Sequence, residues 1–388
     1  MRTNSGKGAV GVALLILVSL GASRARAIPP DPDNAALLYY QAFLSLAELD
    51  EGERTLIREV SGGEIDPNDR ARECIQKCRG AIGFAKAAAQ VPTCNWGVRF
   101  SQGFDALMPQ LAHVRFLAFV LVADARTQAA DGNYRGGLER CLLIDTLARQ
   151  VGDDTLVSYL VSIAVRHLGH RCMIDVVGKA SGDVSVLRWL KDELATRPAW
   201  NLTPVRPLKI EMEIALDVMQ MGKLDAFARA VAESDEPMRA KILNAANEDV
   251  LARGRALYSQ RITSMLPIIG SSMPYEQAHA QLEQLSGGFD PNDAASTVAG
   301  LMLPAISRVH TLGTRSEAYV NAARAGVEIC LRKAGSGKLP TTLPAGLPKD
   351  PFSGQDFQYE RTDGGFVLRC HGKDLDKDVM GGFKFAVK

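Results

Sequence analysis

Three aspartates near the C-terminus alternate along the chain in a way that could bind a metal ion. Asp374, Asp376 and Asp378 lie in the stretch GKDLDKD, and alternate carboxylates in a turn can converge on a hard cation such as calcium. An EF-hand loop, however, needs glycine at its sixth position and glutamate at its twelfth, where this chain has Val379 and Phe385. Two interpretations therefore remain open, a calcium site and a solvated acidic turn.

Histidines offer the second candidate chemistry. His167 and His170, with Cys172 close behind, are three residues apart and would share one face of a helix. Two histidines do not make a zinc site, and the adjacent arginines would repel a cation. If these histidines and His113 line one groove together with acidic residues, a hydrolase site would result. No serine-hydrolase elbow, phosphate loop or dinucleotide fingerprint occurs, so a non-catalytic protein is the stronger prediction.

The chain has seven cysteines, an odd number that leaves at least one thiol unpaired within a monomer. Candidate bridges, judged from position along the chain, are Cys78–Cys94, Cys141–Cys172 and Cys330–Cys370. The last would fix the C-terminal tail to the helix before it. Reduced, buried thiols are the alternative.

Residues 1–27 have the pattern of a secretory signal peptide. Arg2 and Lys7 give a basic start, residues 9–22 form an apolar run, and small residues precede a cleavage point after Ala27. The run is shorter than the roughly 20 residues that span a bilayer. We therefore predict an exported protein, periplasmic or associated with the cell surface, with no stable membrane span after cleavage.

Charge excludes some classes of partner. Cleavage would remove four basic residues and no acidic one, changing the formal net charge from +1 to −3. A nearly neutral chain without a run of lysines and arginines has no electrostatic footprint for nucleic acid or for an anionic membrane. A protein or peptide partner in the envelope is the remaining expectation.

Most of the chain has helix-capping residues and apolar residues at helical spacing. Asp-Pro pairs at Asp31, Asp66 and Asp290 can each cap a helix, with proline in the first turn. Four consecutive helices are expected. The first two cover about 107–130 and 135–150, the third begins after a cap at Asp153 or Asp154, and the fourth ends at Pro198. Short loops between successive helices make antiparallel neighbours.

The tail departs from this pattern. Phe357 and Tyr359 alternate with polar residues, as do Phe366 and Leu368 further on, and Asp-Gly-Gly at 363–365 supplies the turn between them. This pattern predicts an antiparallel β-hairpin. Because an isolated hairpin is only marginally stable, its apolar face needs the preceding helix.

These signals divide the chain after the signal peptide into three regions. Residues 28–200 form an N-terminal helical-hairpin region, and a linker with two prolines leads into a second helical region, 201–313. The third region, 314–388, is a helix followed by the hairpin. Its boundary rests on an expected helix break near Gly313 and a capping box that starts at Thr314.

Two stretches resemble known families. Ala129 through Leu138 resembles the inter-helix turn of a tetratricopeptide repeat, although no second copy follows at the roughly 34-residue period. From Thr314 onward the chain resembles the globular end of major pseudopilins of type II secretion. The residues in matching places are Pro340, Asp350, Pro351, Phe352, Gly354, Phe357, Tyr359, Phe366, Gly372 and Asp374.

These resemblances imply a protein-binding surface and, from the pseudopilin tails, a calcium site near the alternating aspartates. The N-terminal segment lacks the prepilin cleavage pattern, and the rest of the chain has no counterpart in that family. The whole order resembles uncharacterised exported bacterial helical proteins that have the same tail.

The sequence thus predicts a mainly α fold, with antiparallel helical hairpins packed as in tetratricopeptide repeats and a small C-terminal β-hairpin. The predicted function is non-catalytic binding or scaffolding in the envelope. The alternatives are an envelope hydrolase with scattered active-site residues and a secretion-apparatus accessory that acts through its tail.

Overall fold

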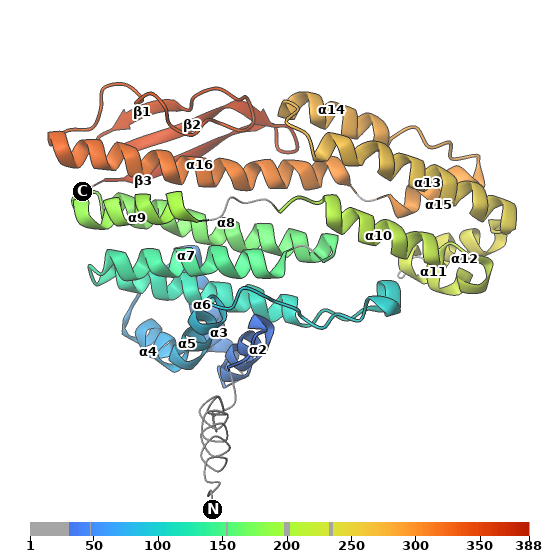
Figure 1. Cartoon of the computed structure of the whole chain (residues 1–388), viewed down its shortest axis with the longest axis horizontal. Helices are drawn as coiled ribbons and strands as arrows, with labels where there is room; N and C mark the ends of the chain where they lie inside the picture. Colours follow the sequence, from blue (N-terminus) through green and yellow to red (C-terminus); the bar gives the residue numbers. More distant parts are fainter. Residues whose placement is uncertain are drawn as a thin grey trace, which may run out of the picture. The chain divides into compact units, whose positions relative to one another are not determined.

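The structure is a computed structural model. It describes residues 31–46, 48–152, 154–197, 202–232, 236–303 and 305–387, and the predicted signal peptide lies outside them. Residues from Asn34 onward form one compact unit. This unit is mainly helical and has a small antiparallel sheet at its C-terminal end, which confirms the predicted fold class (Figure 1).

Four short helices begin the described chain. Their bounds are α2 (Ala35–Ser45), α3 (Glu51–Gly62), α4 (Asp69–Lys77) and α5 (Arg79–Ala88). The Asp-Pro pairs do not cap helices as predicted. Helix caps lie two or three residues further on, at Asn34, Asn68 and, later in the chain, Asp293. Because proline restricts the residue before it to extended backbone, the turn is completed first and the next Asn or Asp binds the free N–H groups.

Longer helices follow, joined by short turns as predicted. After a short 3₁₀ helix, η2 (Phe100–Asp105), they are α6 (Gln110–Ala130), α7 (Tyr134–Val151), α8 (Leu156–Lys179) and α9 (Val184–Thr196). A Cβ at Gly137 would lie 2.8 Å from the carbonyl oxygen of Ala125, so this glycine lets α6 and α7 approach closely. Thr155 caps α8 by accepting the N–H of Ser158. The cap was predicted at Asp153 or Asp154; Asp154 is not the cap, and Asp153 lies outside the described residues.

A second group of helices follows, and all of its α-helices except α14 contribute to a separate apolar cluster that includes Phe227 and Tyr258. The members of this group are α10 (Val205–Val218), η3 (Met221–Lys223), α11 (Leu224–Ala232), α12 (Glu236–Ala245), α13 (Glu248–Ile269), α14 (Tyr275–Ser286) and α15 (Ala294–Met302). Among the described residues, no helix of the chain is both long and apolar enough to cross a membrane.

Helix α16 (Ile306–Ser336) runs unbroken for 31 residues. The predicted break near Gly313 is therefore wrong, and the predicted regional boundary falls inside a helix. The hydroxyl of Thr314 donates to the carbonyl of His310 within the helix instead of capping a new one. A Thr-x-x-Glu pattern is ambiguous in this way, because a mid-helix threonine can bond back to the preceding turn.

The tail forms a three-stranded sheet in the order β1-β2-β3, with strands β1 (Gln358–Thr362), β2 (Gly365–Asp374) and β3 (Val379–Ala386). The predicted hairpin corresponds to β1 and β2, with Tyr359 opposite Leu368. The third strand was not predicted. Its Phe385 stacks on Phe366, with ring centroids 4.6 Å apart, and a Cβ at Gly326 of α16 would overlap the Phe385 ring.

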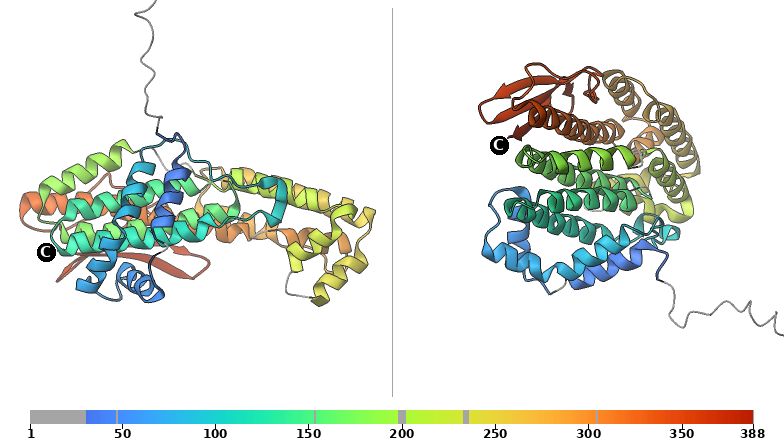
Figure 2. Two further views of the ribbon diagram at one scale, coloured as in Figure 1. Left: turned by 90° about the horizontal axis from the view of Figure 1, so that it is seen from below. Right: turned by 60° about the vertical axis from the view of Figure 1, so that its left-hand side comes forward.

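The sheet packs on both α16 and α8, with α9 beside them, and the layers then continue through α7 and α6 to the short helices (Figure 2). One continuous apolar core extends through these layers and contains both N-terminal residues such as Tyr39 and sheet residues such as Phe366. The C-terminal sheet is thus a part of the core that the first helices build.

Candidate functional site

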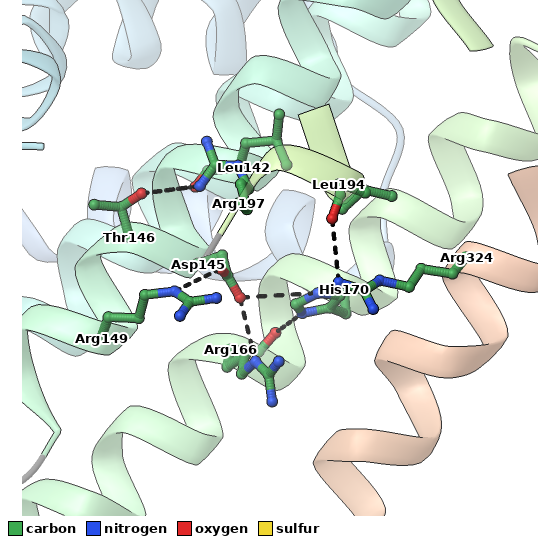
Figure 3. A network of polar contacts seen from close by, with 9 residues as sticks. All are labelled: Leu142, Asp145, Thr146, Arg149, Arg166, His170, Leu194, Arg197 and Arg324. Atoms are coloured by element: carbon green, nitrogen blue, oxygen red, sulfur yellow. Dashed lines mark hydrogen bonds and ion pairs between the residues drawn. The ribbon is translucent and has the colours of Figure 1, made fainter. Parts of the chain in front are cut away.

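A buried carboxylate on α7 holds two helices together. Asp145 is 5% exposed, and its two oxygens accept from the Nε groups of Arg149, at 3.1 Å, and of Arg166 on α8, at 3.2 Å. His170, one turn after Arg166, donates from Nδ1 to the Arg166 carbonyl at 3.0 Å. Its Nε2 lies 3.9 Å from Asp145 (Figure 3).

Burial and charge together fix the protonation of this cluster. Burial lowers the pKa of His170 to about 4, so its imidazole is neutral at pH 7. Burial also lowers the pKa of Arg166, to about 10, which still leaves it charged at neutral pH. Burial alone would raise the pKa of Asp145, but His170, Arg166 and Arg149 outweigh it and lower the pKa. Because His170 is neutral above pH 4, the two arginines provide this stabilisation at pH 7.

Two further arginines beside the cluster form hydrogen bonds between neighbouring segments. Arg197, just after α9, donates from Nη1 to the Leu142 carbonyl at 3.2 Å and to the Thr146 hydroxyl at 3.1 Å. Arg324 of α16 donates to the Leu194 carbonyl at 3.2 Å. Figure 3 shows these contacts beside the Asp145 cluster. Guanidinium groups from three different parts of the chain are thereby held at fixed positions.

Those arginines line a cavity of about 900 Å³ between α8, α9, α16 and the loop at 345–348, which we term the basic pocket. Its charged residues are Arg166, Lys191, Arg197, Arg324, Arg332, Glu317 and Glu328. The pair Lys191–Glu328, at 2.7 Å, neutralises itself. Positive charge therefore exceeds negative charge on the wall.

Several polar atoms of residues on this wall have no hydrogen-bond partner among the described residues. Among the described residues, Arg197 Nε, His310 Nδ1 and Ser316 Oγ are buried without a hydrogen-bond partner. Burial and the charge of His279 lower the pKa of His310, which favours its neutral form. Guanidinium groups present parallel N–H donors that match a carboxylate, so the arrangement can bind an acidic ligand.

The alternating aspartates do not converge on one point, as the calcium interpretation of this turn required. Asp374 pairs with Arg315 at 2.5 Å, Asp376 lies 3.4 Å from His279, and Asp378 pairs with Lys373 at 2.9 Å. Three different side chains thus engage the three carboxylates separately. In the part of the chain that the structure describes, no three His, Cys, Asp or Glu side chains are placed to hold a metal ion.

The three histidines singled out from the sequence do not share a groove. The His113 ring stacks on Phe43, with centroids 5.3 Å apart, and His167 meets the edge of Tyr319 at 4.2 Å. His170 belongs to the Asp145 cluster. A hydrolase site that requires these histidines to converge is therefore not formed.

All seven cysteines are free in the structure. The predicted Cys330–Cys370 bridge is not formed, although both thiols are buried. Burial raises the pKa of Cys370, and the nearby carboxyl of Asp350, which accepts its thiol hydrogen bond, raises it further. The thiols of Cys141 and Cys172 lie in hydrogen-bond contact between α7 and α8.

The chain matches no protein-family model, and no curated protein or solved structure is significantly similar to it. The resemblances to pseudopilins and to tetratricopeptide repeats thus remain predictions. What defines the site is its geometry, a basic pocket on a rigid helical frame.

Proposed function

We propose that this is a non-catalytic binding protein of the bacterial envelope, and that its basic pocket holds an acidic segment of a peptide or protein partner. The envelope location rests on the signal-peptide pattern in residues 1–27. The binding role rests on one observation: Arg197, Arg324 and Arg332 gather on one wall where Lys191 already neutralises Glu328, which leaves Glu317 as the only further acidic residue among the described lining residues.

The size and spacing of the wall favour an extended ligand. A volume of about 900 Å³ lies within the range of about 300–1,000 Å³ that is usual for ligand sites. Arg324 and Arg332 are eight residues apart on α16, or about 12 Å along the axis. An extended peptide covers that distance in about four residues, so two acidic side chains about four residues apart would match.

Rigidity supports the same conclusion. Arg166 and Arg197 are held by hydrogen bonds to α7, and Arg324 by a carbonyl of α9. Groups fixed before binding lose less conformational entropy when the ligand arrives. A pocket of this kind gains affinity without a large rearrangement.

The proposal is tested with a fluorescent peptide that carries glutamates four residues apart, and with the same peptide carrying glutamines. Each charge-assisted bond contributes about 1.5–3 kcal/mol, so Arg324→Gln or Arg332→Gln should weaken binding about tenfold or more. The matched control is Arg188→Gln, an exposed arginine on α9 that does not line the pocket. If the glutamine peptide binds equally well, or if all three variants bind alike, the proposal is wrong.

A further inference from the structure

A second cavity, of about 750 Å³, lies on another face of α8 and α16, and we term it the apolar pocket. Its apolar lining comes from α6, α8 and α16 and includes Phe119, Leu156, Leu160, Leu168, Val309 and Leu312. The two pockets share Ile163 and Ser316. They otherwise use different faces of the same turns of these two helices, so they are neighbouring but distinct cavities.

Charge around the apolar pocket has one sign. Its basic residues are Arg115, Arg308, Arg315 and Lys377, and none of the described residues that line it is acidic. Arg315 is paired with Asp374. The other three are exposed and form no ion pair with any described residue. Three cations at the edge of an apolar cavity are thus available to a ligand.

Two polar side chains, His167 and Ser316, also line this pocket. Burial lowers the pKa of His167 to about 4, and the charges of Arg171, Arg315 and Lys377 lower it further in the same direction. Its imidazole is therefore neutral at pH 7. Ser316 is 3% exposed, and its hydroxyl has no partner among the described residues. The wall offers a hydroxyl and an uncharged imidazole where an anion would enter.

We propose that the apolar pocket binds an amphiphilic carboxylate with one alkyl chain, of the fatty-acid class. The chain would lie against the leucine and phenylalanine side chains, and the carboxylate would meet Arg308, Arg115 and Lys377. A neutral apolar ligand would leave three cations unmatched. A small hydrophilic anion would leave the apolar wall uncovered. Only a ligand with both parts satisfies both surfaces.

The test uses the full chain and sodium dodecanoate below its micelle-forming concentration, followed by isothermal titration calorimetry. One molecule should bind per chain, and decanoate, which lacks two methylenes, should bind about fifteenfold more weakly, because each buried methylene changes affinity about fourfold. Dodecyltrimethylammonium, which has the same chain and the opposite charge, should not bind. Equal binding of the two surfactants would overturn the proposal, as would the absence of dodecanoate binding.

Variants separate this site from the basic pocket. Arg308→Gln and Lys377→Gln should each weaken dodecanoate binding severalfold, since both side chains are exposed and their removal leaves the core intact. Ala164→Trp should block the pocket sterically. The control Arg332→Gln, which alters only the basic pocket, should leave dodecanoate binding unchanged. Unchanged binding in the first three variants would refute the assignment.

A spectroscopic readout reports on the carboxylate itself. The carboxylate should raise the pKa of His167, which is measured by following its imidazole resonance in an NMR titration with and without dodecanoate. Binding without any change at His167 would place the ligand elsewhere and overturn the proposal. A final arm uses vesicles of anionic phospholipid. If the chain binds these vesicles and dodecanoate does not compete, the surface is a membrane contact and the proposed free ligand is wrong.

Discussion

Replacing Asp145 by asparagine tests whether the buried charge cluster holds α7 and α8 together. The substitution keeps the size of the side chain, so it creates no cavity. It removes the negative charge opposite Arg166, whose side chain is only 6% exposed. Arg149 is less affected, because 22% of its side chain already reaches solvent.

The expected loss can be worked out from this geometry. Removing one partner of a buried ion pair costs about 3–5 kcal/mol, because the other charge stays buried and unpaired. Asparagine keeps one acceptor oxygen for Arg166, so we expect the lower end, about 3 kcal/mol. For a unit of this size, that corresponds to a fall in melting temperature of about 4 °C.

The assay is urea unfolding of the purified full chain, followed by far-ultraviolet circular dichroism. The control is Glu139→Gln, which breaks the exposed pair of Arg135 and Glu139 on the same helix and should cost about 0.3–0.5 kcal/mol. The double variant Asp145→Asn/Arg166→Met should be more stable than Asp145→Asn alone, since it has no unpaired buried charge. A loss below 1 kcal/mol, or a double variant no more stable than the single one, would refute the reasoning.

Two further predictions concern packing and pH. Gly326→Ala should destabilise the protein by about 1–3 kcal/mol through overlap with Phe385, whereas Gly335→Ala on the same helix, with open space around it, should be neutral or stabilising; equal melting temperatures would contradict this. The unfolded chain protonates His170 near pH 6.5 and the folded chain only near pH 4, so stability is fully present above pH 6.5 and falls by about 3 kcal/mol as pH drops towards 4. His170→Asn should reduce that fall, as measured by urea midpoints at pH 7.5 and 4.5, and an unchanged pH profile would count against the assigned protonation.

The helices were predictable because their signals are local. Periodicity and turn residues placed α6, α7 and the β1–β2 hairpin correctly. The third strand was missed because Gly381 and Gly382 interrupt its alternation. A Cβ at Gly381 would lie 3.2 Å from the sulfur of Cys370, a close contact between β2 and β3. The small residues that suit this close packing also remove the alternation by which a strand is recognised.

The site was largely hidden from the sequence for a different reason. Arg166 was visible only as a charge beside two histidines, and Arg197 and Arg324 belong to no motif. These arginines lie close together because α16 packs against both α8 and α9. No short sequence motif specifies how those helices align. The charges of any one helix do not reveal the excess of positive charge in the basic pocket, because the arginines come from three separate segments of the chain.

The position of β3 also determines when the protein can finish folding. This strand lies against α8 and α16, and Phe385 fills space in the same core that Tyr39 enters from the first helix. Synthesis delivers the chain with its N-terminus first, so the early helices must wait for residue 386 before their core closes. Closing contacts so distant in sequence is slow, and the unfinished helices keep apolar surface exposed meanwhile. The chain therefore offers a chaperone a long interval in which to bind it.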